Sequence, residues 1–237
     1  MGPEVEMVLI HGAGLDTYIW DGVASRLRRP TRPVSFPNRG RGDGANRGLT
    51  LRDYTTAVRA QVEEAEGPMV LVAHSIGGCV ALELADRLGD RVVGIIGVSA
   101  AFPERGQSFI SSLPVPQRWV LPLLMRVFGT RPPAKAIQQS LCADLPPERS
   151  REVVDRFTPE ARALYKAKVE YESLPAPRWY VKLTRDRDFP PYVQDAMAAN
   201  LQATEVIEMD TAHLPMMSHP EELTGILEDF ARHVENA

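Results

Sequence analysis

Ser75 stands in the stretch whose residue types and spacing most clearly indicate chemistry. An apolar run at 69–73 leads into His74 and Ser75, and a helical pattern follows at once. A sharp turn from strand to helix needs small residues two positions before and after the serine, and Ala73 and Gly77 supply them. Such a turn exposes the hydroxyl, and the helix N-terminus behind it favours developing negative charge. A serine that only caps a helix could stand in a similar sequence, but the strand before Ser75 and the paired glycines after it favour a nucleophile.

A glycine-containing loop, His11–Gly14, follows the first apolar run and suggests where an oxyanion could bind. Acyl transfer needs two backbone N–H donors aimed at the carbonyl oxygen as it gains charge. We expect these donors at Ala13 and at Ile76, the residue after the nucleophile, with Gly12 allowing a close approach to substrate. An ordinary tight turn or a phosphate loop is the alternative, and the glycine pattern of phosphate loops is absent.

His213 is the best placed of the five histidines to act as a base, because it lies in the loop after the last expected strand. His11 belongs to the glycine loop and is expected to be structural. His74 adjoins Ser75, but neighbouring strand residues point to opposite faces, so we expect it to support the site by packing. His219 and His233 fall on the final helix and are expected to be solvated.

The acid that would orient this histidine should also follow a strand. Asp186 and Asp188 both come after the expected strand 179–183, and Asp210 is a third candidate three residues before His213. A buried carboxylate would hold the imidazole in one orientation and stabilise its protonated form. Aspartates at such positions also serve as turn residues or helix caps, most plausibly Asp188, which precedes two prolines.

Alternating strands and helices must position these residues. Short, near-continuous apolar runs are typical of buried parallel strands, and we expect them at 7–10, 33–36, 69–73, 92–98, 179–183 and 205–209. Amphipathic helices are expected between and after them, at 17–28, 51–65, 76–88, 192–201 and 220–234. Thr50 and Asp53 resemble a capping box, and Gly89 is suited to end a helix.

This alternation predicts one α/β domain over 1–237, with a central, mostly parallel sheet of about six strands flanked by helices. One region departs from this alternation of strands and helices. Residues 101–177 are rich in proline, carry no clear strand, and contain an apolar stretch at 119–128 and a helical one at 150–172. We expect a helical lid inserted over the carboxyl edge of the sheet, where open α/β folds bind ligands.

Taken together, the motifs resemble the α/β-hydrolase superfamily over essentially the whole chain. Ser75, Asp186 and His213 occur in that family's order, with His11 upstream. The chain is most similar to the serine esterase branch that contains bacterial esterases, plant methyl esterases and hydroxynitrile lyases. Residues 184–190 match the branch's T-x-D-x-x-I-P motif, with phenylalanine at the isoleucine position. That match implies Asp186 as the acid.

The resemblance also bears on the reaction. The lyases of the branch need a threonine and a lysine where this chain has Gly12 and Leu214, which argues against cyanohydrin chemistry. The implied reaction is hydrolysis of a carboxylic ester through an acyl-enzyme, without cofactor or metal. We expect Gly12, Tyr18, Trp20, Leu214 and Met216 to contact substrate, although each could equally be plain core.

Composition limits the other classes of function. The formal charge is −4, and 44% of the 237 residues are apolar. The basic run at 26–32 is better placed to complement a helix end than to bind phosphate. Two cysteines cannot build a disulfide framework or a zinc site, and no apolar stretch is long enough for a membrane span. We therefore expect a cytoplasmic protein that binds a small ester, with neither nucleic acid nor membrane as partner and a homodimer allowed.

Two alternatives to an esterase stay open. The same residues could serve a thioesterase, a lactonase or a biosynthetic cyclase, because the catalytic groups are shared and specificity lies in the lid. A receptor of this fold that binds a small ligand without turnover is the other alternative, which an intact set of catalytic residues disfavours.

Overall fold

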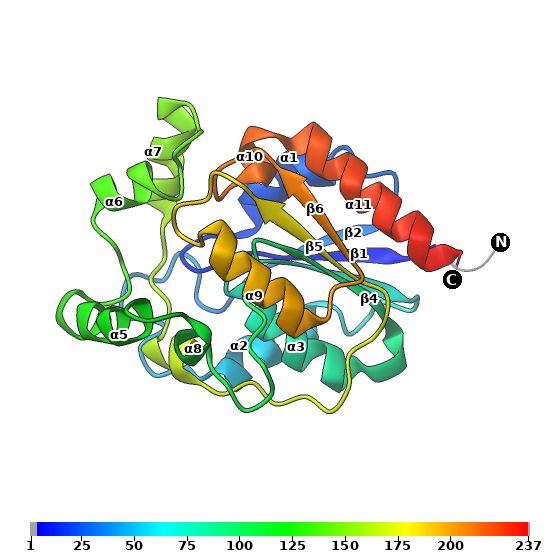
Figure 1. Ribbon diagram of the computed structural model, residues 1–237, viewed down its shortest axis with the longest axis horizontal. Helices are drawn as coiled ribbons and strands as arrows, with labels where there is room; N and C mark the ends of the chain where they lie inside the picture. The colour runs from blue at the N-terminus through cyan, green and yellow to red at the C-terminus, as the bar shows by residue number, and fades with distance from the viewer. Residues whose placement is uncertain (1–3, 237) are drawn as a thin grey trace.

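Six parallel strands form one sheet in the computed structural model, which describes residues 4–236 (Figure 1). The strand order is β2-β1-β3-β4-β5-β6, which confirms the predicted fold class. The first three residues and Ala237 of the predicted 1–237 domain lie outside the described part. The strands are β1 (Glu6–Ile10), β2 (Thr31–Val34), β3 (Met69–His74), β4 (Val92–Val98), β5 (Arg178–Leu183) and β6 (Glu205–Met209).

Helices connect the strands and cover the sheet. They are η1 (Thr17–Trp20), α1 (Asp21–Ala24), α2 (Leu51–Gln61), α3 (Gly77–Leu88), η2 (Gly89–Arg91), α4 (Phe109–Ser112), α5 (Gln117–Phe128), α6 (Ala134–Gln139), α7 (Pro147–Arg156), α8 (Arg162–Lys166), α9 (Pro191–Leu201), α10 (Pro215–Ser218) and α11 (Pro220–Glu235). The expected capping box at Thr50 and Asp53 starts α2, and Gly89 ends α3. Within residues 4–236 no helix is long and apolar enough to cross a bilayer.

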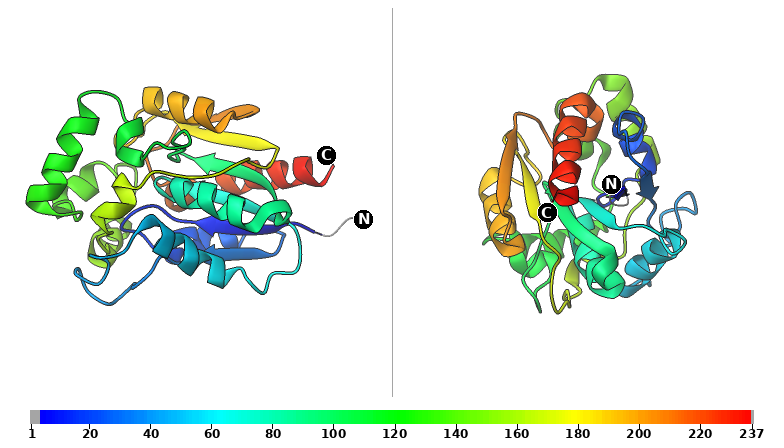
Figure 2. Two further views of the ribbon diagram at one scale, coloured as in Figure 1. Left: turned by 90° about the horizontal axis from the view of Figure 1, so that it is seen from below. Right: turned by 90° about the vertical axis from the view of Figure 1, so that its right-hand side faces the viewer.

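The two faces of the sheet bury separate cores because successive strand side chains point to opposite sides. On one face Val8 and Ile10 of β1 pack in a cluster with residues of α2, α3 and α9. On the other, Met7 and Leu9 join a cluster with residues of α1 and α11. Figure 2 shows the helices on both sides of the sheet.

The chain places its second and third strands on opposite sides of β1, with β2 on one side and β3 on the other. Ligands of open α/β sheets bind outside the carboxyl ends of the strands at such a switch point. The loop at 11–14 follows β1, and Ser75 follows β3, so both stand at this point. All six strands are parallel, which brings the segments after β4, β5 and β6 to the same edge.

Two sequence expectations near the N-terminus were wrong in their limits. The strand expected at 33–36 occupies Thr31–Val34 and pairs only with β1, an edge position that tolerates Pro33. The helix expected at 17–28 ends at Ala24. The backbone N–H of Arg28 instead donates to Glu228 of α11.

Residues 101–177 carry α4 to α8, and these helices gather at the end of the molecule opposite the two termini (Figures 1 and 2). The apolar stretch at 119–128 lies within α5, as expected. The helix expected at 150–172 is wrong, because it divides into α7 and the short α8. Between them Thr158 forms an antiparallel bridge with Gly14, so pairing with the loop after β1 replaces helical hydrogen bonds.

Candidate active site

Ser75 occupies a strained turn between β3 and α3. Its φ of 54° lies in the left-handed region, which non-glycine residues rarely adopt. The turn fits only because small residues surround it: a Cβ on Gly77 would lie 2.7 Å from the carbonyl oxygen of His11, and one on Gly78 would lie 2.3 Å from that of Ala101. These contacts give the physical reason for the paired glycines after the serine.

His213 and Asp186 form a buried pair at the same edge of the sheet. The His213 Nδ1 lies 2.5 Å from Asp186 Oδ2, and the Ser99 hydroxyl donates to the same oxygen at 2.7 Å. The other carboxylate oxygen accepts the backbone N–H groups of Asp188 and Phe189, each at 2.9 Å. Four hydrogen bonds therefore fix the orientation of Asp186, and Asp186 in turn fixes the imidazole.

The electrostatics of this pair favour a protonated histidine beside an ionised aspartate. Burial by itself lowers the pKa of His213, but the Asp186 charge, its hydrogen bond and the Asp188 charge together raise it above 6.5. Burial likewise acts to raise the pKa of Asp186, and the attraction and hydrogen bond of His213 bring it below its ordinary value. The imidazole is thus a stronger base than a free histidine.

His74 supports His213 from below. Its Nε2 lies 2.9 Å from the carbonyl oxygen of His213, so this nitrogen carries the proton and donates it. Burial and the nearby His213 lower the pKa of His74 to about 3, which keeps the ring neutral. Trp20 packs edge-on against the His74 ring. A Cβ on Gly12 would lie 2.7 Å from the Ser75 Cβ and 3.0 Å from His74 Nδ1, so only glycine leaves room here.

The loop after β1 lies beside the serine. His11 Nδ1 lies 2.8 Å from the Gly12 carbonyl oxygen, and its Nε2 accepts the Phe36 backbone N–H at 3.1 Å. This buried ring therefore anchors the loop, as expected of a structural histidine. Ala13 lines the cavity together with Ser75. Ile76 is the N-cap of α3, where backbone N–H groups have no intrahelical acceptor.

A cavity of about 550 Å³ opens above Ser75 and His213. Ser75 and His213, both in the described part of the chain, form no direct hydrogen bond. Hydrogen bonds between catalytic residues commonly tighten only when substrate binds. Most of the wall is apolar and comes from α4, α5, α6, α8 and the loops beside them. The lining residues are Ala13, Ser75, Phe109, Leu121, Leu124, Met125, Phe128, Gly129, Thr130, Arg131, Pro132, Pro133, Ala136, Leu141, Phe157, Tyr165, Asp188, Phe189 and His213.

The five residues expected to contact substrate are all described, and this cavity's lining includes none of them. Trp20, Leu214 and Met216 are fully buried in the core between the sheet and α11. Tyr18 is also buried, and the Arg156 guanidinium lies 3.7 Å from its ring centre. Gly12 lies beneath Ser75. The side chains of Tyr18, Trp20, Leu214 and Met216 thus lie in the core, which is the alternative left open for each of them.

The other aspartates differ in position. Asp210 is exposed and pairs with Arg185 at 3.2 Å. Asp188 faces the cavity, and its Oδ1 accepts the Ser140 hydroxyl at 2.8 Å. Desolvation by the surrounding protein raises the pKa of Asp188 despite its access to the cavity.

The two remaining histidines lie away from the cavity. The His219 side chain is half-buried, with Nδ1 2.9 Å from the Ser218 hydroxyl. His233 is exposed and packs against Trp179.

Asp186, Asp188 and His213 offer potential metal-ligand atoms within 4.8 Å of one another. Two of those atoms, His213 Nδ1 and Asp186 Oδ2, are already joined by the short hydrogen bond. A metal would have to break that bond, so the donor set fits proton transfer better than metal binding.

Sequence reasoning missed Ser99, and it expected apolar residues of the lid to shape a pocket without identifying the individual wall residues. Ser99 follows β4 as Ser75 follows β3, and its φ of 43° is also in the left-handed region. A search for polar residues directly after each strand would have found it. The wall residues leave no comparable signal, because apolar side chains in helices are equally typical of a core.

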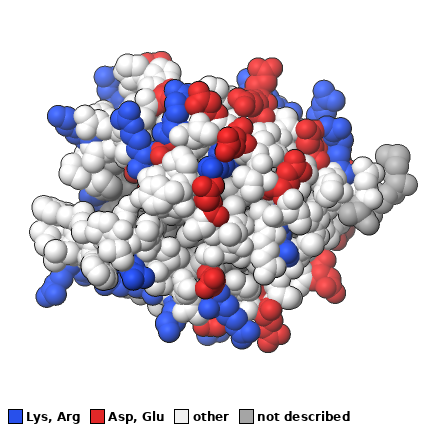
Figure 3. Space-filling model, viewed as in Figure 1, with Lys and Arg blue, Asp and Glu red and all other residues white. Residues whose placement is uncertain are grey.

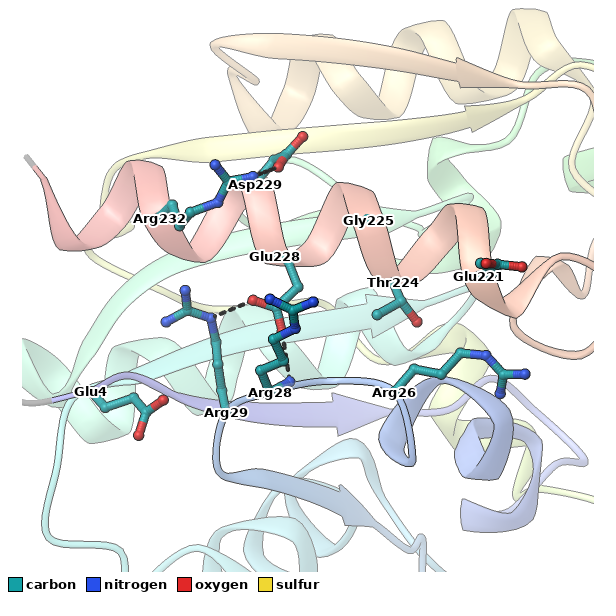
Figure 4. Close-up of a pocket in the computed structure, with 10 residues that line it drawn as sticks. All are labelled: Glu4, Arg26, Arg28, Arg29, Glu221, Thr224, Gly225, Glu228, Asp229 and Arg232. Carbon is teal, nitrogen blue, oxygen red and sulfur yellow. Dashed lines mark hydrogen bonds and ion pairs between the residues drawn. The ribbon is translucent and has the colours of Figure 1, made fainter.

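A second hollow, of about 780 Å³, lies between the segment after α1 and helix α11 (Figure 4). Its walls are charged, and some of the charges pair: Arg29 bonds to Glu228 at 3.1 Å and contacts Glu235, and Glu228 also accepts the Arg28 backbone N–H. Arg28 and Arg29 of the basic run at 26–32 thus meet acids of α11. None of the residues that line this hollow lines the cavity at Ser75.

The sheet topology, the serine turn and the buried histidine–aspartate pair define the class of protein. The chain belongs to the α/β hydrolase family, whose model matches residues 7–225. The family predicted from the motifs is therefore confirmed.

Individual proteins of known name or structure are also similar to this chain. The chain is 28% identical to the pyrethroid hydrolase of Sphingobium wenxiniae, over 95% of this chain and 87% of that protein. It is 25% identical to a pimeloyl-acyl carrier protein methyl ester esterase of Neisseria meningitidis, over 97% of this chain and 94% of that protein. Among solved structures it resembles an extracellular α/β-hydrolase from a Paenibacillus species. That match has a TM-score of 0.82 and 23% identity and covers 95% of this chain and 98% of that one.

Proposed function

We propose that this protein is a serine hydrolase that cleaves carboxylic esters of small, largely apolar molecules. One observation carries the proposal: Ser75, on its strained turn, and His213, held by Asp186, line the same apolar cavity. A nucleophile, a base and an acid that orients the base are the three groups that acyl transfer requires. The names of the relatives, a pyrethroid hydrolase and a methyl ester esterase, support the same class of bond.

In the first half of the reaction Ser75 Oγ attacks the ester carbonyl carbon while His213 Nε2 takes the hydroxyl proton. The carbonyl oxygen becomes an oxyanion, which the Ala13 and Ile76 N–H groups hold. Asp186 stabilises the imidazolium without taking its proton. The intermediate then expels the alcohol oxygen, which receives that proton from His213, and leaves an acyl group on Ser75.

Water completes the cycle. His213, neutral again, removes a proton from a water molecule as the water oxygen attacks the acyl carbon. The second tetrahedral intermediate collapses, the carboxylic acid leaves, and Ser75 Oγ recovers its proton from His213. No step needs a metal or an organic cofactor.

The cavity wall supports an uncharged substrate. Phe109, Leu121, Met125, Phe128 and Phe157 present apolar surface, which favours aliphatic or aromatic groups on either side of the ester. The Asp188 carboxyl near His213 disfavours an anionic group close to the reacting bond. We propose residues 101–177 as a lid, because α4, α5, α6 and α8 supply much of this wall.

The same catalytic atoms would also cleave thioesters and lactones. The catalytic residues therefore support the acyl-enzyme mechanism without separating these classes of acyl substrate. The receptor alternative is less well supported. A ligand-binding pocket has no need of a serine at φ 54° beside a histidine whose pKa is raised, since backbone strain of this kind is stored mostly where it serves function.

Hydrolysis of short-chain p-nitrophenyl esters tests the proposal. We expect Ser75→Ala to lower turnover by about 10⁴- to 10⁶-fold. Diisopropyl fluorophosphate should add to one residue of the wild-type protein, identified by mass spectrometry as Ser75. Ser25→Ala, which changes a serine outside the cavity, is the matched control and should behave as wild type.

Circular dichroism and thermal melting must show Ser75→Ala to be folded. A folded Ser75→Ala protein that keeps a tenth of the wild-type rate would contradict the assignment of the nucleophile. A wild-type protein that binds these esters without turning them over would favour the receptor alternative instead.

A further inference from the structure

Helix α5 turns a strongly apolar side to solvent. Trp119, Leu123 and Val127 are 68%, 62% and 65% exposed, and their spacing of four residues places them in one stripe along the helix. Val120 and Phe128 widen this stripe, since both are also exposed. Most large apolar side chains of a helix at a protein surface face the core, so this exposed apolar face calls for an explanation.

The same helix forms part of the cavity wall. Met125 is buried, and Leu121, Leu124, Met125 and Phe128 line the cavity that contains Ser75. Trp119, Leu123 and Val127 are not part of that lining. One side of α5 therefore faces the candidate active site, and an adjoining side faces outward.

The charged residues of the segment that contains α5 have one sign. Residues 105–143 contain five basic residues and no acidic one, although the chain as a whole carries a net charge of −4. Two of the five are paired, Arg131 with Asp43 and Arg105 with Glu170. The others are Arg118, Arg126 and Lys135, for which the described part of the chain provides no ion pair. Figure 3 shows the white surface over α5 at the left, with basic side chains at its border.

We propose that α5 docks on an anionic lipid surface. Helices that lie in a membrane interface combine an apolar stripe of Trp, Phe and Leu with basic residues, and they bury the stripe about 5–10 Å deep. In this arrangement the Trp119–Leu123–Val127 stripe enters the acyl boundary while Arg118 and Arg126 meet the phosphates. The cavity wall formed by Leu124 and Phe128 then lies beside the lipid.

This inference departs from the expectation of no membrane partner, which rested on the lack of a spanning stretch. A surface helix needs no span, because it lies along the interface rather than across it. The docking is also independent of ester hydrolysis, since neither Ser75 nor His213 takes part in it.

Trp119 provides a direct probe of docking. The other two tryptophans, Trp20 and Trp179, are buried, so a change of tryptophan emission on adding vesicles reports on Trp119. The protein is used as Ser75→Ala, which prevents any hydrolysis of the lipid. With vesicles of phosphatidylglycerol and phosphatidylcholine we expect a blue shift of emission and co-sedimentation, both weakened by salt. Vesicles of phosphatidylcholine alone should bind much less.

Variants separate the charge from the apolar stripe. Each basic residue near an anionic surface contributes about a five-fold change in partitioning, so Arg118→Gln with Arg126→Gln should weaken binding by about 25-fold. Leu123→Ser with Val127→Ser should abolish co-sedimentation. The matched controls are Arg52→Gln with Arg59→Gln on α2 and Val206→Ser on β6, which change exposed residues of the same types elsewhere.

Three outcomes would overturn the proposal. One is the absence of both blue shift and co-sedimentation with the anionic vesicles at low salt. Another is equal binding to the two kinds of vesicle, which would remove the role of charge. The third is a dimer that already buries Trp119 without lipid, seen as blue-shifted emission that reddens on dilution. That result would assign this face to a second copy of the chain.

Discussion

At the scale of single residues, the environment of Asp186 decides what His213 can do. The carboxylate is buried, yet it accepts four hydrogen bonds, from His213, Ser99 and the backbone of Asp188 and Phe189. These bonds compensate for the loss of water, since a buried charge is tolerated only when it is paired and hydrogen-bonded. Asp188 has a different environment, because its carboxyl faces the cavity and bonds to Ser140.

The two aspartates should therefore respond differently to the same substitution. We predict that Asp186→Asn lowers ester turnover by about 10⁴-fold, because the amide cannot stabilise the imidazolium or enforce its tautomer. Asp188→Asn should cost far less and serves as the matched control. Steady-state kinetics on a p-nitrophenyl ester make the comparison, and the reverse ranking would move the acid to Asp188.

The pH dependence follows from the raised pKa of His213. A base must be neutral to take the Ser75 proton, so activity is lost as pH falls through this pKa. Sequence alone left the direction of the shift open, because Asp186 and burial oppose each other. In the structure the Asp186 charge, its hydrogen bond and the Asp188 charge together outweigh burial, so we predict that kcat/KM falls to half at a pH above 6.5.

Substitution of either aspartate should lower the pH at which kcat/KM falls, because both charges raise the pKa of His213. Asp186→Asn should move it further than Asp188→Asn, since Asp186 contributes the larger charge effect and the hydrogen bond. The measurement is the pH profile of kcat/KM for the three proteins, with the fold checked at each pH. A wild-type profile that stays flat down to pH 4 would rule out a histidine base.

At the scale of elements, a buried Glu160 joins the loops around the site. Its Oε1 accepts the Gly14 backbone N–H at 3.0 Å and the Arg39 guanidinium at 2.5 Å. Its Oε2 accepts the Tyr54 hydroxyl at 2.9 Å, and its backbone oxygen accepts the Thr130 hydroxyl at 2.6 Å. One residue thus connects the loop after β1, helix α2 and the 101–177 segment.

Loss of this carboxylate should destabilise the protein strongly. We predict that Glu160→Ala lowers the free energy of unfolding by about 3–5 kcal/mol, because the largely buried Arg39 is left without its partner. Urea denaturation followed by circular dichroism measures the change. Glu152→Ala, which removes two partly exposed ion pairs, with Arg149 and with Arg156, should cost at most about 1 kcal/mol. Similar losses in the two variants would show that Glu160 is not a structural centre.

At the scale of the whole molecule, the sheet and the 101–177 segment differ in packing. Strand β3 is buried along its whole length, with β1 and β4 hydrogen-bonded to its two sides. Helix α5 buries only Met125 and exposes much of its apolar surface. Local opening costs least where few apolar contacts are buried, so the two regions should differ in stability.

Hydrogen exchange should resolve this difference. We predict that amides of α5 and α6 exchange about 10³-fold faster or more than those of β3 and β4. Exchange of peptic fragments, followed by mass spectrometry in the absence of lipid, gives both regions in one experiment. Helix α2 serves as an internal reference, because it packs on α3. Protection of α5 equal to that of β3 would show that the 101–177 segment opens only with the sheet.

Local patterns in the chain were enough to predict the strands, the fold class and the residues that follow the strands. Apolar runs define buried parallel strands locally, and parallel strands must bring their carboxyl ends to one edge. The positions of Ser75, His213 and the candidate aspartates at that edge could therefore be predicted from the order of residues, and the resemblance to the family implied Asp186 among those aspartates. The glycines around Ser75 could also be recognised, because a tight turn imposes a local steric requirement.

Which side chains form the cavity and which form the core depended instead on tertiary packing. Trp20, Leu214 and Met216 have the same apolar character as Leu121 and Phe128, yet the first three are buried and the last two line the cavity. The hydrogen bonds of Ser99 to Asp186 and of Glu160 to Gly14 join residues 87 and 146 positions apart. Contacts at such separations depend on how the helices pack on the sheet, which no local pattern in the chain specifies.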